Sequence, residues 1–435
     1  MTRLALAIAS VLLASVLTGH DARAQEPPVA RQVFANGLTV LVRENPAVGV
    51  VAVSLQVRAG SRFETEATAG ITNFLQRAMV KGTARRTAVQ LLTSAEDIGG
   101  SLDANGEVEA AEIRGHALAR HWETLLALVA EVALQPALRP EEVENERRLL
   151  LGQIKARADA PFAFSLDTLL RELYGANPYG LSQIGLKSSI ERLPREDLLA
   201  HYRAIYQPER MVLAVSGQVE RRAVIKAAER LFGRMARSGQ GLQAAQPVSE
   251  PPGDRKVITR PAQQAQILVG YLGPGLSDPM YPAVRVLSAA LGGGMAGRLF
   301  TELRDRQGLA YTTQVFMGPR IGPTFLVAYI GTAPASAAAA EAGVLKELER
   351  VRTAPISADE LARAKAYLKG QLVMDRRTNA RQAWYLAYYE TVGVGWDFPD
   401  RYARAIDAVT VDDTARAAQR YVTRPTIVVL QPSAR

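Results

Sequence analysis

Three polar side chains within residues 71–83, ITNFLQRAMVKGT, have a spacing that could support chemistry. Asn73, Gln76 and Arg77 stand at i, i+3 and i+4, so one face of a helix would present all three to a single metal ion or substrate atom. None of them is a good zinc ligand, because proteins bind zinc through Cys, His, Asp and Glu. The stretch is therefore either an ordinary polar helix face or a catalytic site that has lost its ligands.

Other residues that could bind a metal or attack a substrate form no recognisable site. The chain has four His, and no two of His20, His116, His121 and His201 stand at i, i+3 or i+4; Cys is absent. A His-based zinc site is therefore not predicted, and disulfides hold nothing together. His116 and His121 are interpreted as a strand-end and a helix-start residue. The sequence also lacks a G-x-S-x-G elbow and a phosphate loop.

A run of three glycines, Gly292, Gly293 and Gly294, lies between two expected helices. Such a run can bind an anion at the start of a helix. From the residues alone, the simpler interpretation is a flexible turn that joins the two helices.

The composition favours a soluble globular protein. Of 435 residues, 48% are hydrophobic and 22% charged, and the length suits two domains. The formal charge of +9 is spread along the sequence, without a basic run interleaved with aromatic residues. Nucleic acid is therefore not predicted as a partner.

Residues 1–24 have the pattern of a signal peptide. Arg3 precedes an apolar segment at 4–17, and the small-x-small sequence Ala22-Arg23-Ala24 follows. This segment is too short for a comfortable membrane span, and no later run approaches eighteen apolar residues. We therefore expect an exported protein without a membrane span in the mature chain, periplasmic if the source is Gram-negative.

The elements that would position these residues alternate between strands and helix pairs, which indicates an α+β fold. Residues 34–45 and 48–64 read as strands, residues 101–117 as a strand pair with a turn at Asn105-Gly106, and segments 265–273 and 324–332 as further strands.

The order of elements returns after a Gln, Gly, Ser and Pro-rich stretch. Residues 139–154, RPEEVENERRLLLGQI, echo residues 357–372, SADELARAKAYLKGQL, at a constant offset of 218 residues. We expect two homologous α/β-sandwich halves, each an antiparallel-rich sheet with helices packed on it. The predicted domains are 25–236 and 257–435, joined by a linker at 237–256.

Several stretches resemble the pitrilysin-like metallopeptidases, the group with an inverted zinc motif that includes mitochondrial processing peptidase and insulin-degrading enzyme. Residues 291–316, LGGGMAGRLFTELRDRQGLAYTTQVF, are similar to the signature of the family's second domain. Residues 177–220, FANGLTVLV and VRAGSRFE also match the family, so the resemblance covers nearly the whole mature chain.

In that family a helix carries H-x-x-E-H, in which two His bind zinc and the Glu is the general base; a distant Glu is the third ligand. The resemblance places Asn73 and Arg77 at the His positions and Gln76 at the Glu position. The third ligand, about 76 residues further on, falls on Gln153. Amides are poor zinc ligands and Arg77 is permanently charged, so the resemblance implies a member that binds no metal of its own.

The same resemblance assigns substrate binding to Arg298, Tyr311 and the Gly292 to Gly294 turn. In the family the Arg and Tyr hold the substrate backbone and polarise the scissile carbonyl, which suits two hydrogen-bond donors. The structural alternative is an Arg in a helix-face salt bridge and a Tyr packed in the sheet.

The favoured function is a non-catalytic, substrate-binding subunit of an exported two-chain zinc peptidase. A homologous partner in a heterodimer would carry the intact motif and the zinc, and this chain would contribute to peptide hydrolysis through Arg298 and Tyr311. The alternative is a structural, assembly or peptide-binding protein with no role in catalysis. A self-sufficient zinc peptidase with other ligands is the least favoured hypothesis.

Overall fold

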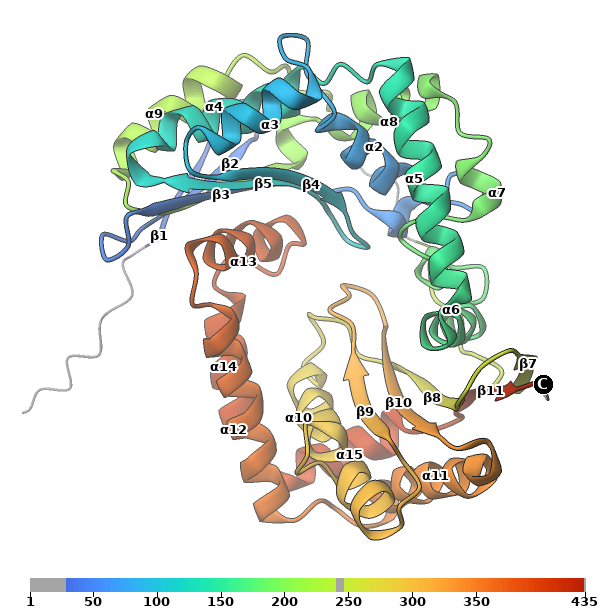
Figure 1. Ribbon diagram of the computed structural model, residues 1–435. Helices are drawn as coiled ribbons and strands as arrows, with labels where there is room; N and C mark the ends of the chain where they lie inside the picture. The colour runs from blue at the N-terminus through green and yellow to red at the C-terminus, as the bar shows by residue number, and fades with distance from the viewer. Residues whose placement is uncertain (1–28, 240–245, 434–435) are drawn as a thin grey trace, which may run out of the picture.

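A computed structural model describes residues 29–239 and 246–433, so the predicted signal peptide at 1–24 lies outside the described residues. The described residues form two halves, each built on one β-sheet, and Figure 1 shows the two halves facing each other across the molecule. The predicted α+β class with two sheets is confirmed. No helix within the described ranges is long and apolar enough to span a membrane.

The two sheets have the same strand order once the first strand is set aside. Within the described residues, the first sheet runs β1-β2-β6-β3-β5-β4 and the second runs β7-β11-β8-β10-β9. One neighbouring pair in each sheet is parallel, β2 with β6 and β7 with β11, and the other pairs are antiparallel. This is the pattern that duplication of one unit would produce. The strands are β1 Val29–Val33, β2 Thr39–Glu44, β3 Val50–Val57, β4 Ser101–Gly106, β5 Ala111–Leu118, β6 Met211–Gly217, β7 Arg255–Arg260, β8 Ala265–Gly273, β9 Thr312–Met317, β10 Thr324–Thr332 and β11 Thr426–Pro432.

The helices follow the strands in a similar order in both halves, except that a helix follows the last strand of the first half and none follows β11 among the described residues. The first half has α2 Ile71–Met79, α3 Ala88–Glu96, α4 Trp122–Leu134, α5 Pro140–Asp159, α6 Pro161–Tyr174, α7 Lys187–Ile190, α8 Arg195–Ile205 and α9 Arg221–Phe232. The second half has α10 Tyr281–Gly292, α11 Ala337–Thr353, α12 Ala358–Asp375, α13 Asn379–Thr391, α14 Phe398–Ala408 and α15 Val411–Tyr421, with a π-helical segment at Phe300–Arg306.

Each sheet buries one face against helices of its own half. Because side chains alternate along a strand, Val53 and Leu55 of β3 face the core formed with α2, α4 and α9. Ile267 and Val269 of β8 pack in the same way against α10, α11 and α15.

The other face of each sheet is covered by a helix from the opposite half. Ala383 and Ala387 of α13 pack against Ala52 and Ala214 of the first sheet, and Figure 1 shows α13 directly beneath that sheet. Its two ends are tied down by hydrogen bonds, from Asn379 Nδ2 to the carbonyl of Val50 at 2.8 Å and from Arg58 Nε to the carbonyl of Thr391 at 2.7 Å.

The reciprocal contact is made by α6, which packs against the second sheet. Leu169 and Leu173 lie in a buried cluster with Leu268 and Val428. A Cβ added at Gly270 would lie 2.9 Å from a methyl carbon of each leucine, so glycine lets the helix approach the strand closely. The two halves thus share their cores.

The hairpin of β4 and β5 differs from the sequence prediction. Asn105 and Gly106 belong to β4 and pair with β5, and the chain turns over 107–110 instead. Glycine at position 106 has a different reason: a Cβ there would lie 2.7 Å from the backbone nitrogen of Asn73. Gly106 therefore permits the close approach of α2 to β4. The second half begins its sheet at Arg255, within the range predicted as a linker.

The shared cores give a first prediction. Leu169→Ala should lower the free energy of unfolding by about 2–5 kcal/mol, because it removes methyl groups from a fully buried contact between the halves. Urea denaturation of the purified chain measures this change. Leu92→Ala is the matched control: this leucine is exposed on α3, and its loss should change stability by less than about 0.5 kcal/mol. Equal effects of the two substitutions would contradict the packing described.

Candidate functional site

The helix that carries the degenerate motif is buried and anchored at its N-terminus. Of the nine residues of α2, only Arg77 is not buried. The carboxylate of Glu64 accepts hydrogen bonds from the backbone nitrogens of Gly70 at 2.7 Å and Thr72 at 3.0 Å. A carboxylate at this end satisfies unpaired N–H groups and complements the helix dipole. Burial nevertheless raises the pKa of Glu64, against the opposing effect of these hydrogen bonds.

Arg77 occupies the position that the resemblance assigns to a zinc ligand, and its guanidinium is engaged with α5. Its Nε donates to Glu146 Oε2 at 3.0 Å and its Nη1 donates to Gln153 Oε1 at 3.0 Å. Lys81 Nζ lies 3.0 Å from the other oxygen of Glu146, whose side chain is only 3% exposed. Two cations therefore neutralise one buried carboxylate and join α2 to α5.

The two amides of the motif point to different neighbours. Asn73 Nδ2 donates to the carbonyl of Gly106 at 3.2 Å, and Gln76 Oε1 accepts from the hydroxyl of Tyr206 at 3.0 Å. Asn73 Oδ1 and Gln76 Nε2 are buried without a hydrogen-bond partner among the described residues. Gln76 is fully buried, and burial raises the pKa of Tyr206, so its phenol stays protonated as the donor.

A histidine outside the motif also contacts α2. His201 Nε2 lies 3.0 Å from Thr72 Oγ1. Burial lowers the pKa of His201 to about 4, so the ring is neutral near neutral pH. His201 thus holds the start of α2 by a neutral hydrogen bond.

The residues present do not fit zinc. A zinc site in this place would need His or carboxylate ligands at positions 73, 77 and 153, which hold two amides and a guanidinium. The Arg77 side chain spans the space between α2 and α5 and uses the nearby carboxylate of Glu146 for its own ion pair. No cluster of three His, Cys, Asp or Glu that could hold a metal occurs among residues 29–239 and 246–433.

Arg298 lies in an ion pair within its own half. Its Nε and Nη2 donate to the two carboxylate oxygens of Glu360, both at 2.8 Å, and the residue is 8% exposed. Burial alone would raise the pKa of Glu360. Hydrogen bonds from Arg298 and Ser357 outweigh burial, and the pKa of Glu360 is lowered to about 2. Arg298 Nη1 has no partner among the described residues.

Tyr311 is the exposed member of the predicted substrate-binding residues. It directly precedes β9, is 62% exposed, and its hydroxyl has no hydrogen-bond partner among the described residues. Its backbone nitrogen donates to the carbonyl of Gly331 at 3.0 Å. The backbone of Tyr311 is therefore fixed beside β10, and its exposed phenol remains free to donate.

The glycine run ends α10 and forms a tight turn. The backbone nitrogens of Gly293 and Gly294 donate to the carbonyls of Ala289 and Gly292, so neither is free to bind an anion. Gly294 has a φ of 81°, which favours glycine. The turn lines a cavity of about 370 Å³.

The structure joins Arg77 to Gln153 directly, as the 76-residue separation implies. No hydrogen bond or ion pair within the described ranges links this pair to Arg298 or Tyr311. Sequence reasoning missed Glu64, Glu146, His201 and Tyr206. Only Glu146 had a local signal, since it lies on the same helix as Gln153, two turns earlier.

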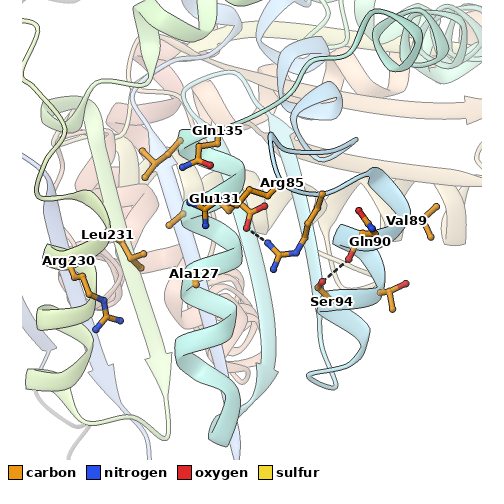
Figure 2. Close-up of a pocket in the computed structure, with 13 residues that line it drawn as sticks. Arg85, Val89, Gln90, Ser94, Ala127, Glu131, Gln135, Arg230 and Leu231 are labelled. Carbon is orange, nitrogen blue, oxygen red and sulfur yellow. Dashed lines mark hydrogen bonds and ion pairs between the residues drawn. The ribbon is translucent and has the colours of Figure 1, made fainter.

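A cavity of about 780 Å³ lies away from both groups of residues. Figure 2 shows it between α3, α4 and α9, lined by side chains such as Gln90, Glu131 and Arg230. None of the predicted site residues lines it. Although this cavity is large, it is therefore not part of the degenerate site.

Comparison with known proteins identifies the class of protein. The family described as insulinase, peptidase family M16, matches residues 39–186, and the family described as peptidase M16 inactive domain matches residues 192–368. A protein named an uncharacterized zinc protease from Mycobacterium leprae is 31% identical over 354 residues, covering 81% of this chain and 80% of that protein. Another so named, from Mycobacterium bovis, is 29% identical and covers 91% of each chain.

Solved structures share the fold. A protease from Helicobacter pylori superimposes with a TM-score of 0.87 at 22% identity, covering 94% of this chain and all of the other. A peptidase M16 inactive domain from Pseudomonas fluorescens gives a TM-score of 0.86 at 22% identity and covers 93% of this chain and 98% of its own. The chain belongs to peptidase family M16, and the resemblance to these metallopeptidases is confirmed. The resemblance places Asn73, Arg77 and Gln153 at the family's zinc-binding positions.

The partly buried His201 predicts a pH effect on stability. The pKa of a histidine in the unfolded chain is near 6.5, and burial lowers the pKa of folded His201 to about 4. The unfolded state therefore binds more protons than the folded state between these two pH values. The contribution of His201 should fall as the pH drops through this window, by about 3 kcal/mol in all. Urea denaturation of wild type and His201→Gln from pH 7 to 4 measures the difference.

Comparison with the His201→Gln variant is needed because Glu112 changes the stability with pH in the opposite direction to His201. Burial raises the pKa of Glu112 to about 7, so the folded state holds its extra proton and this contribution falls as the pH rises. The difference between wild type and His201→Gln cancels Glu112. A difference that does not change with pH would contradict the neutral state of folded His201.

Restoring the motif should restore metal binding. The combined substitutions Asn73→His, Gln76→Glu, Arg77→His and Gln153→Glu should bind one zinc ion per chain after dialysis, because they supply three ligands around the place that Arg77 fills. Elemental analysis and calorimetric titration measure the metal. The matched control restores all but Arg77 and should bind at least about 100-fold more weakly. Equal zinc binding by unmodified and restored chains would contradict our account of the site.

Proposed function

We propose that this chain is a non-catalytic, peptide-binding subunit that works with a homologous zinc-bearing chain. The observation that carries the proposal is the Arg77 guanidinium, which is paired with Glu146 and bonded to Gln153 where the family binds its metal. A positive charge fixed at that place repels a zinc ion, and Gln76 cannot act as a general base. Hydrolysis would therefore take place on the partner.

Exposed apolar side chains on α5 and α12 support an interface with a partner. Leu149, one turn before Gln153, is 56% exposed, and Val373 near the end of α12 is 68% exposed. Gly152 and Gly370, at equivalent places in the middle of these two helices, have no atom of this chain within 4 Å of an added Cβ. Glycine inside a helix lowers stability by roughly 0.5–1 kcal/mol, so a reason outside this chain is expected.

Of the two residues expected to assist the partner, Tyr311 is the one available to a substrate. Its exposed phenol can donate to a peptide carbonyl, whereas two of the three nitrogens of the Arg298 guanidinium are already bonded to Glu360. We infer that Tyr311 contacts the substrate and that Arg298 orders the start of α12, with Nη1 as its remaining donor.

The second candidate is a structural or assembly protein without a role in catalysis. The ion pair between Arg298 and Glu360 favours it, because it gives Arg298 a stabilising role that a scaffold would also need. The exposed phenol of Tyr311 has no such role within the chain and favours the first candidate.

We propose that the protein is exported, and that it is periplasmic if the source is Gram-negative. It rests on the sequence pattern of residues 1–24, in which a charged start, an apolar segment and a small-x-small site follow in order.

The proposal predicts that activity requires mixing two chains. The purified chain alone should cleave no peptide, and it should raise the turnover of a homologous H-x-x-E-H chain from the same genome in a fluorogenic peptide assay. Tyr311→Phe should reduce this enhancement about 10- to 100-fold, because it removes one donor aimed at the developing charge. Its melting temperature should not change, since the hydroxyl has no hydrogen-bond partner among residues 29–239 and 246–433.

Tyr421→Phe is the control, because its hydroxyl donates to Asp278 at 3.1 Å and is not expected to touch the substrate. It should leave the enhancement unchanged. Chelator-sensitive cleavage by the purified chain alone would overturn the proposal, and an enhancement that survives Tyr311→Phe would favour the scaffold.

A further inference from the structure

Another cavity, of about 570 Å³, lies in the second half between α10, α12, α13 and α14. Figure 1 shows the column of α12 and α14 beneath α13, with α10 beside it. Its lining combines one arginine, Arg285, with the tyrosines Tyr281, Tyr385, Tyr389 and Tyr402. A volume of this size holds a small ligand or the end of a peptide.

The charge of Arg285 has no counter-ion in the cavity. Its Nε donates to the hydroxyl of Tyr402 at 3.2 Å, and it forms no ion pair with any described residue. The lining contains a single carboxylate, Asp375, which accepts from Arg381 Nη2 at 2.5 Å and from the Tyr385 hydroxyl at 2.7 Å. Asp375 is therefore already neutralised by another arginine.

Two phenols in the same lining also lack partners. The hydroxyls of Tyr281 and Tyr389 make no hydrogen bond to a described residue, although Tyr281 is only 5% exposed. Neither hydroxyl oxygen is among the buried side-chain atoms without a partner, so each is accessible and can donate to a ligand. Burial raises the pKa of Tyr281 to about 12, which keeps its proton in place and makes it a donor at neutral pH.

The cavity therefore offers donors that remain available after Asp375 has been paired with Arg381 and Tyr385, set in apolar walls. The guanidinium of Arg285 and the two free phenols can all donate to a carboxylate, and arginine binds a carboxylate through two parallel hydrogen bonds. Met317, Leu368, Leu372 and Phe398 supply apolar surface around them. The ligand that satisfies both features carries a carboxylate on an apolar body.

This cavity adjoins the one formed by the glycine turn. Both cavities are lined by Arg285, Leu368 and Gln371. The cavity of about 370 Å³ is also lined by Gly292 to Gly294. Gln371 is the counterpart of Gln153 at the 218-residue offset. A peptide that lies along the turn would thus reach the donors beside Arg285 with its end.

We propose that the cavity around Arg285 is a carboxylate-binding site that takes the C-terminal carboxylate of an apolar peptide. This inference rests on the proposed peptide-binding function and adds how the end of a peptide is recognised. An acidic side chain or a small apolar acid would present the same group, and the experiment separates these sources.

The test measures binding to the full mature chain by fluorescence polarisation. Dye-labelled Ala-Ala-Leu-Phe with a free carboxylate should bind at least about tenfold more tightly than its C-terminal amide, because one charge-assisted pair is lost. An amidated peptide with an internal Asp should bind as weakly as the amide. Unlabelled 4-phenylbutyrate should compete at higher concentration, as the same group on a smaller body.

Arg285→Gln should abolish the difference between acid and amide, and Tyr281→Phe should reduce it about threefold without loss of charge. The matched control is Arg404→Gln, since Arg404 is exposed on α14 and outside the lining; the difference should remain. Thermal melts verify that the variants fold, and Tyr281→Phe provides the test if Arg285→Gln does not.

Equal binding of acid and amide by wild type, or a difference that survives both cavity variants, would overturn the site. Tight binding of the Asp peptide alone would overturn the assignment to the C-terminal end. Because this assay uses the isolated chain, its outcome is separate from the partner's turnover, so failure of one proposal does not imply failure of the other.

Discussion

The exchange of α6 and α13 between the two halves is the packing constraint on which the structure depends. Each sheet would expose one apolar face in isolation, and each is covered by a helix that belongs to the other half. These helices follow α5 and α12 directly along the chain, so both long helices are anchored at their ends across the molecule. The positions of Glu146 and Glu360, on which the two arginines depend, follow from this anchoring.

An arginine joins the two helices on which the resemblance places the family's zinc ligands. In the family a metal joins the motif helix to the helix of the third ligand; here Arg77 joins α2 to α5 through Glu146 and Gln153. A partly buried guanidinium between two hydrogen-bonded partners can fix two helices in place, because its donors are planar and directional. The packing of α2 against α5 is therefore retained without the ligands that a zinc site needs.

The sequence predicts local features well and long-range contacts poorly. Segments 265–273 and 324–332 coincide with β8 and β10, because their alternation and apolar content are local signals. The proximity of Arg77 and Gln153 followed from the family resemblance. The exchange of α6 and α13, the partner of Arg298 and the reason for Gly106 depend on segments far apart in the chain, and no local pattern encodes them.

The ion pair between Arg77 and Glu146 has a consequence for the binding of metal ions other than zinc. A site that keeps even two histidines can capture copper or nickel in place of zinc, because those ions bind nitrogen ligands at least as strongly. A guanidinium in that position is a ligand for none of these ions, because it is positively charged and has no lone pair to offer. The α2–α5 junction is thus held by an ion pair and a hydrogen bond that require no metal ion.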